Sequence, residues 1–134
     1  MKVIHILLVE DDDLDRIDMK RTLDKQKILY KLHEAKNGEE ALQYLLDADV
    51  LPDLILIDIN MPRMNGLELL KAIRDSETLQ HLKCFIITTS EEKVDKVEAK
   101  ELGISGYIVK PLKLNNPSSM DAFNLMIDLL NMKD

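Results

Sequence analysis

The chain has little cysteine, few aromatic residues and no long apolar segment, and each shortage removes a class of protein. Cys84 is the single cysteine, so no disulfide can form within the chain and a reducing compartment is expected. No apolar run approaches the length of a membrane span. Residues 3–9 are apolar except for His5, but they lead directly into acidic residues without a cleavage site for a signal peptide. We therefore expect a cytoplasmic protein that does not associate with membranes.

Basic residues are the minority among the charged side chains. There are 18 lysines and arginines against 25 aspartates and glutamates, which gives a formal net charge of −7. Non-specific nucleic-acid binding depends on clustered basic residues. The sequence has no basic patch with interleaved aromatic residues. The three histidines lack the spacing of a metal site, and no Walker or kinase motif is present. Nucleic acid is therefore not an expected partner.

The length of 134 residues and the hydrophobic fraction of 46% fit one domain with a real core. No linker, repeat or low-complexity tract interrupts the chain. We expect residues 1–134 to form a single domain without an output domain.

Short apolar runs alternate with capped or amphipathic segments along the whole chain. Residues 54–57 are apolar without alternation, which is typical of a strand buried on both faces of a parallel sheet. Two capping pairs, Asn37 with Glu40 and Asn65 with Glu68, predict helix starts. The strands are expected at residues 3–9, 28–35, 54–57, 84–88 and 104–109. Helices are expected from residue 12 or 13 to about 27, after Asn37, after Asn65, over 91–102 with Ser90 as cap, and from about 117–119 to 132. This pattern predicts an α/β, flavodoxin-like fold, with a doubly wound five-stranded parallel sheet of order 2-1-3-4-5 and five helices.

Acidic, hydroxyl and basic side chains follow four of the predicted strands. These side chains are Glu10 and Asp11 after the first strand, Asp58 after the third, Thr88 at the end of the fourth and Lys110 after the fifth. In this strand order the ligand-binding switch point lies between the first and third strands. Three ionised carboxylates repel one another there, and a hard divalent cation would remove the conflict. Few carboxylates with room for waters and a phosphate favour Mg²⁺. The cluster has the groups needed to transfer a phosphoryl group to a carboxylate.

Other acidic residues in this segment have a simpler explanation. Asp12, Asp13 and Asp15 are interpreted as acidic residues that a helix N-terminus favours. Their spacing resembles the start of an EF-hand loop, but Arg16 stands where that loop needs glycine. We therefore exclude a calcium loop of that type.

The chain resembles the response-regulator receiver domains of two-component signalling over about residues 3–131. The segments that carry the resemblance are VEDD after an apolar strand, DINMPRMNG, ITTS and GYIVKP, in this order and with matching separations. It is similar to stand-alone, chemotaxis-regulator-like receivers, including those paired with phytochrome-like or hybrid kinases. The fold that this family adopts is the one that the strand pattern predicts.

The resemblance implies a phosphoacceptor, a Mg²⁺ site and a conformational switch. Asp58 would accept the phosphoryl group. The metal residues would be Glu10, Asp11, Asp58 and the carbonyl of Asn60, with Asp11 as the direct ligand. Thr88 would bond a phosphoryl oxygen, Lys110 would pair with it, and Tyr107 would turn inward as Thr88 moves. The Lys110–Pro111 peptide bond would be cis.

Three functions compete for this site. The first is a signalling module that a sensor histidine kinase phosphorylates and that then binds a downstream target through the fourth helix, the fifth strand and the last helix. The second is a phosphorelay intermediate that passes the phosphoryl group to a histidine phosphotransfer protein. The third, a phosphatase with an aspartyl nucleophile, is disfavoured because Asn60 replaces the second aspartate of the usual Asp-x-Asp motif. We expect no enzyme beyond catalysis of its own phosphorylation and dephosphorylation.

The last expected helix has an unusually broad apolar surface. Apart from Lys133 near its end, the polar side chains occupy only about 80° of a helical wheel drawn for residues 120–133. A helix on one face of a sheet needs an apolar stripe only slightly wider than about 100°. We therefore expect a homodimer through this helix, with Leu125 and Leu129 at its centre.

Overall fold

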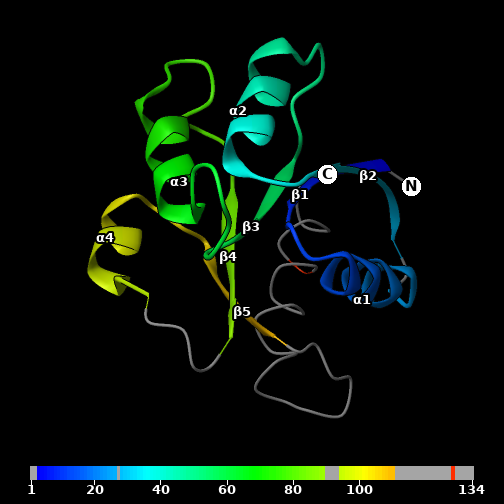
Figure 1. Cartoon of the computed structure of the whole chain (residues 1–134). Helices are drawn as coiled ribbons and strands as arrows, with labels where there is room; N and C mark the ends of the chain where they lie inside the picture. The colour runs from blue at the N-terminus through cyan, green and yellow to red at the C-terminus, as the bar shows by residue number, and fades with distance from the viewer. Residues whose placement is uncertain (1–2, 27, 90–93, 111–127, 129–134) are drawn as a thin grey trace.

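The computed structural model describes residues 3–26, 28–89, 94–110 and 128. Strands and helices alternate along this part of the chain (Figure 1). In chain order the elements are β1 (Val3–Val9), α1 (Asp13–Asp24), β2 (Leu29–Ala35), α2 (Gly38–Asp47), β3 (Leu54–Asp58), α3 (Gly66–Asp75), β4 (Cys84–Thr89), α4 (Lys96–Glu101) and β5 (Gly106–Lys110).

All strand pairs are parallel, and the five strands lie in the order β2-β1-β3-β4-β5. The predicted doubly wound sheet is confirmed. The helix expected between residues 117 and 132 lies outside the described residues, apart from Asp128. The predicted dimer contacts of Leu125 and Leu129 lie outside them as well.

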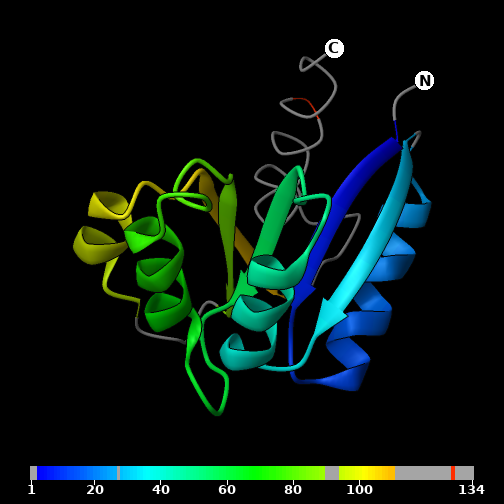
Figure 2. The same cartoon turned by 90° about the horizontal axis from the view of Figure 1, so that it is seen from above.

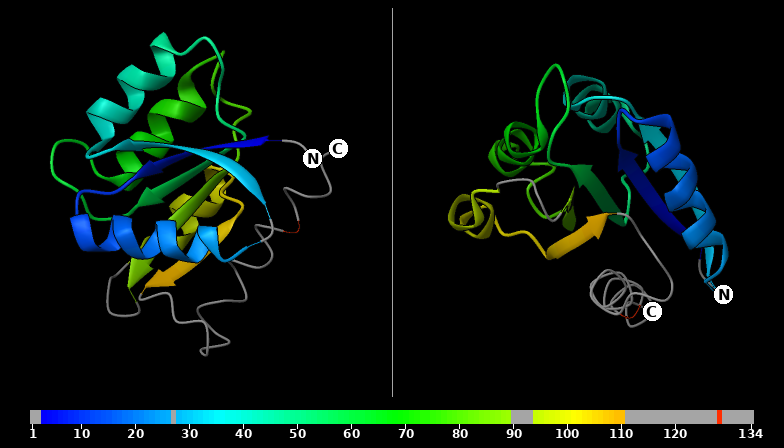
Figure 3. Two further views of the ribbon diagram at one scale, coloured as in Figure 1. Left: turned by 90° about the vertical axis from the view of Figure 1, so that its right-hand side faces the viewer. Right: turned by 60° about the horizontal axis from the view of Figure 1, so that its bottom comes forward.

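The sheet is the middle layer of the molecule. Among the described helices, α1 covers one face, and α2, α3 and α4 lie on the other (Figures 2 and 3). Leu7 and Ile57 point into the core on the α2–α3 side, whereas Ile6 and Leu56 pack with Met19 of α1. Every residue of β3 is buried. The absence of alternation in this strand therefore reflects burial on both faces.

The helix starts follow their capping residues. The Asn37 side chain accepts a hydrogen bond from the Glu40 N–H, and Asn65 and Glu68 form a complete capping box, as predicted. These caps fix where α2 and α3 begin. None of the described helices is long and apolar enough to cross a membrane.

Some element boundaries differ from the prediction. Helix α1 ends at Asp24 rather than near residue 27. Helix α4 begins at Lys96, because the Asp95 side chain caps it by accepting from the Glu98 N–H at 3.0 Å. The cap predicted at Ser90, which lies outside the described residues, is therefore wrong for this helix. Strand β5 begins at Gly106, because Ile104 still belongs to the turn that closes α4, with its N–H bonded to the Ala99 carbonyl.

Candidate functional site

The carboxylates predicted to converge do so at the carboxyl end of the sheet. Val9 and Ile57 are partners in the β1–β3 register, so Glu10 and Asp58 follow them at the same edge. One carboxylate oxygen from each of Glu10, Asp11 and Asp58 lies within 4.8 Å of the others. Glu10 and Asp58 are only 1% and 3% exposed, whereas Asp11 is exposed. The cluster is therefore open to solvent at Asp11.

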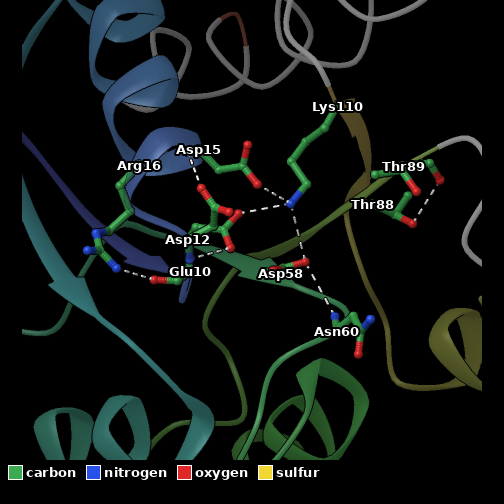
Figure 4. Close-up of polar contacts among 9 residues, drawn as sticks. All are labelled: Glu10, Asp12, Asp15, Arg16, Asp58, Asn60, Thr88, Thr89 and Lys110. Carbon is green, nitrogen blue, oxygen red and sulfur yellow. Dashed lines mark hydrogen bonds and ion pairs between the residues drawn. The ribbon is translucent and has the colours of Figure 1, made fainter.

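Lys110 comes from the last position of β5 and points into this cluster (Figure 4). Its Nζ atom lies 3.0 Å from Glu10 Oε1 and 3.7 Å from Asp58 Oδ1. The lysine that the sequence predicted as a site residue at the end of the fifth strand therefore faces the carboxylates at the ends of the first and third strands.

Asp15 also belongs to the cluster, and the sequence interpretation missed it. It lies in the first turn of α1, as expected for an acidic residue near a helix N-terminus, but its carboxylate accepts from Lys110 Nζ at 2.8 Å. A helix that begins four residues after a strand end keeps its first-turn side chains near that sheet edge. The short distance in sequence between the end of β1 and Asp15 was therefore the feature that could have indicated its place in the cluster. The interpretation of Asp15 as a helix-terminus acid was incomplete.

Burial and mutual charge shift the proton affinities of the cluster. Burial, followed by the hydrogen bond and negative charge of Asp58, raises the pKa of Glu10 to about 8, although Lys110 acts in the opposite direction. Burial alone would lower the pKa of Lys110, but Asp15, Glu10 and Asp58 together raise it above its ordinary value. Burial and Asp58 therefore both disfavour the ionised form of Glu10, whereas the surrounding carboxylates favour the charged form of Lys110.

Hydrogen bonds that involve backbone groups hold the residues of the cluster in place. The Asn60 N–H donates to Asp58 Oδ1 at 3.3 Å, and the Asp12 N–H donates to Glu10 Oε2 at 3.3 Å. The Arg16 guanidinium donates to the Glu10 carbonyl at 2.8 Å. Asn60 itself is exposed beside Asp58, in the loop that follows β3. The residue predicted to offer its carbonyl to a metal therefore lies next to the cluster.

The two predicted switch residues come from adjacent strands. Thr88 is 6% exposed, and its hydroxyl donates to the Thr89 carbonyl at 3.1 Å (Figure 4). Tyr107 is half-buried beside α4, where Lys96 Nζ lies 5.9 Å from its ring centre. Burial, with a smaller contribution from Asp95, raises the pKa of the Tyr107 hydroxyl. The Lys110–Pro111 peptide bond lies outside the described residues.

The donor set fits a hard divalent cation. Clustered carboxylate oxygens with a solvent-open side match the preference of Mg²⁺ for a few protein oxygens together with water. The residues present therefore fit Mg²⁺.

This fold and site define a class of protein. Residues 6–119 match the family model described as the response regulator receiver domain, and the chain belongs to that family. Receiver domains are the signalling switches of two-component systems, and the predicted resemblance is confirmed.

Particular relatives give a finer comparison. The chain is 38% identical over 110 residues to the chemotaxis protein CheY-3 of Vibrio cholerae, with 82% of each chain covered. It is 35% identical over 108 residues to the nitrate/nitrite response regulator NarL of Escherichia coli, which covers 81% of this chain. A third relative, the sensor histidine kinase CheAY of Helicobacter pylori, is 34% identical over 106 residues, or 79% of this chain. The chain spans 48% of the length of NarL and 13% of CheAY.

Two solved structures are similar along nearly the whole chain. The bacteriophytochrome response regulator AtBRR matches with a TM-score of 0.80 and 30% identity, covering 96% of this chain and 92% of that one. The Mn²⁺-bound form of response regulator Rcp1 matches with a TM-score of 0.75 and 27% identity, covering 94% and 91%.

Proposed function

We propose that Asp58 accepts a phosphoryl group from the phosphohistidine of a sensor histidine kinase and that the modified domain then binds a downstream protein. The observation that carries this proposal is the setting of Asp58. It is 3% exposed at the end of β3, beside the carboxylates of Glu10 and Asp11, with Lys110 Nζ at 3.7 Å. A carboxylate held in this way is positioned to act as a nucleophile.

The transfer exchanges one bond to phosphorus for another. A bond forms between an Asp58 oxygen and phosphorus as the bond between phosphorus and the donor's imidazole nitrogen breaks. The imidazole keeps the electron pair of the broken bond and can take up a proton from solvent. Lys110 has an ammonium near the position where negative charge accumulates, and the Thr88 hydroxyl is a candidate hydrogen-bond donor to a phosphoryl oxygen.

Mg²⁺ is the cofactor that we propose for this step. Glu10, Asp11, Asp58 and the Asn60 carbonyl would hold it, with Asp11 as the direct ligand. When bound, it would neutralise the carboxylates and the incoming phosphoryl oxygens. The similarity to the Mn²⁺-bound form of Rcp1 supports a divalent cation.

The proposed switch connects the site to the surface around α4 and β5. Thr88 and Tyr107 lie on neighbouring strands, and Tyr107 lies beside Lys96 of α4. A movement of Thr88 toward the phosphoryl group would free space for Tyr107 and change the surface that α4, β5 and the expected last helix present to a target. The domain acts on no separate substrate in this scheme.

The experiment that tests the function is labelling with acetyl phosphate in the presence of Mg²⁺, followed by mass spectrometry. We expect one phosphoryl group on Asp58 and none in Asp58→Asn. Equal labelling of Asp58→Asn would overturn the assignment. Incubation of the labelled protein with a histidine phosphotransfer protein distinguishes the phosphorelay alternative, because only an intermediate would hand its label on.

Further proposals rest on the sequence alone. We propose a single cytoplasmic receiver domain that forms a homodimer through residues 120–133. Sedimentation of the wild type beside Leu125→Glu/Leu129→Glu tests the dimer, and a monomeric wild type at micromolar concentration would contradict it.

A further inference from the structure

Asp15 makes the shortest ion pair of Lys110 in the cluster. The Lys110 ammonium lies 2.8 Å from Asp15 Oδ2 and 3.0 Å from Glu10 Oε1, both within hydrogen-bond length. Its distance of 3.7 Å to Asp58 Oδ1 exceeds that length. Two of the three donors of the ammonium are therefore directed to Glu10 and Asp15.

The Asp15 side chain does not cap α1, and a place in the first turn does not by itself direct it toward Lys110. The cap of α1 is Asp12, whose carboxylate accepts from the Asp15 N–H at 3.0 Å. The side chain of Asp15 is about one-third exposed, at 34%, whereas that of Lys110 is 14% exposed. A partly exposed acid of α1 thus reaches into the cluster to contact a largely buried lysine at the end of β5.

We propose that Asp15 is a positioning residue: it binds Lys110 in the unphosphorylated protein and competes with the phosphoryl group on Asp58 for the same ammonium. This inference rests on the proposed function of Asp58. A phosphoryl group adds about 1.5 to 2 negative charges and three strong acceptor oxygens. A phosphoryl oxygen on Asp58 would be a strong acceptor beside the Lys110 ammonium, which lies 3.7 Å from Asp58 Oδ1. The long, flexible stem of lysine permits the ammonium to turn toward that oxygen at the expense of the Asp15 contact.

Competition of this kind lowers the affinity of the site for a phosphoryl group. Lys110 can bond the phosphoryl group only in the fraction of molecules in which its contact with Asp15 is broken. The apparent affinity for the phosphoryl group is reduced by that fraction, as for any partly populated binding-competent state. It also makes the first turn of α1 respond to phosphorylation, because Asp15 loses its partner when Lys110 moves. Replacement of Asp15 by a neutral side chain of equal size should therefore favour the phosphorylated arrangement.

The test is the affinity for beryllofluoride, a mimic of the phosphoryl group, at saturating Mg²⁺. Asp15→Asn keeps the backbone N–H that donates to the Asp12 carboxylate, so the start of α1 is preserved. We expect Asp15→Asn to bind the mimic about threefold to fivefold more tightly than the wild type, the range of a partly exposed ion pair. The affinity for Mg²⁺, measured separately, confirms that saturation holds in both proteins.

The matched control is Asp18→Asn, one turn further along α1. Asp18 is exposed and borders the same small cavity as Lys110, but it makes no ion pair within the described part of the chain. The Asp18→Asn substitution removes the same charge from the same helix, so it measures the general electrostatic effect of losing one negative charge from α1. A thermodynamic cycle with Lys110→Ala adds a second control, because the effect of Asp15→Asn should vanish when the ammonium is absent.

The ¹⁵N resonance of Lys110 Nζ in the unliganded protein provides a reading that does not depend on the mimic. It should shift in Asp15→Asn and stay in place in Asp18→Asn. Equal affinities of wild type and Asp15→Asn, or an equal gain in Asp18→Asn, would overturn the role of Asp15. A wild type that binds no beryllofluoride at saturating Mg²⁺ would instead overturn the proposed function of Asp58.

Discussion

Gly66 packs directly against the backbone of Asp58. A Cβ atom added to Gly66 would lie 2.5 Å from the Asp58 carbonyl oxygen and 2.8 Å from Ile59 Cα. The Gly66 N–H also donates to the Ile59 carbonyl at 3.2 Å, so the start of α3 is fastened to the residue after Asp58. The glycine at the end of the loop is thus required by the close approach of two backbones, one of which carries the proposed phosphoacceptor.

Gly66→Ala should therefore damage both stability and phosphorylation. We expect a loss of about 1 to 3 kcal/mol in the free energy of unfolding, the usual cost of overpacking. The rate of labelling by acetyl phosphate should fall about tenfold, because a displaced nucleophile is poorly aligned. Denaturant titration and labelling kinetics measure the two effects.

Gly103→Ala is the matched control. Gly103 has a φ of +69°, and its added Cβ would meet only Arg74 Nε, at 3.8 Å. The left-handed conformation should cost about 1 kcal/mol, and labelling of the folded protein should be unchanged. Normal labelling in Gly66→Ala would show that the contact with Asp58 does not position the carboxylate.

The strand ends were predictable because parallel strands bring their carboxyl ends to one edge. This rule, together with the expected strand order 2-1-3-4-5, was sufficient to place Glu10, Asp58 and Lys110 together. The contact of Asp15 could not be predicted in the same way, because it depends on how the first turn of α1 is rotated toward Lys110. The start of α4 was predicted too early because several residues in this segment can cap a helix, and only the structure shows that Asp95 does so.

Asp11 should be essential for phosphorylation in the presence of Mg²⁺. It is the exposed member of the carboxylate cluster, so its loss removes the proposed direct ligand. Loss of an outer-shell partner alone weakens metal binding by about tenfold to a hundredfold, and Asp11→Ala should weaken it at least as much. Calorimetry with Mg²⁺ and labelling by acetyl phosphate measure the effect.

Asp49→Ala is a suitable control for the change in net charge, since Asp49 is exposed in the loop between α2 and β3. It should bind Mg²⁺ and accept label as the wild type does. Full labelling of the wild type in EDTA would contradict a role for the metal.

Cys84 should make the stability of the protein fall at alkaline pH. The thiol is fully buried, and burial raises its pKa from 9.0 to about 11, although Arg74 acts in the opposite direction. The unfolded chain therefore releases its thiol proton before the folded chain does, so the stabilising contribution is complete below pH 9 and is lost as the pH rises through 11. Between pH 9 and 11 the thiol should account for a loss of about 2 kcal/mol.

The measurement is the difference in unfolding free energy between the wild type and Cys84→Ala at pH 8, 9, 10 and 11. Lysines and tyrosines titrate in both proteins, so the difference isolates the thiol. A difference that stays constant from pH 8 to 11 would contradict the prediction.

Lys110→Ala should separate modification of Asp58 from the response to it. The variant leaves the buried carboxylate of Glu10 without its ammonium partner, and we expect it to be less stable by roughly 3 kcal/mol without Mg²⁺ and by less with it. Asp58 should still accept label, because the proposed nucleophile and the proposed metal residues are intact. The shifts in NMR resonances of Tyr107 and α4 on adding beryllofluoride should become smaller, since the charge that appears on Asp58 has lost its counter-ion from β5. Lys100→Ala, which removes an exposed charge from α4, should respond like the wild type. A full response in Lys110→Ala would show that the signal leaves the site by another route, with Thr88 as the next residue to replace.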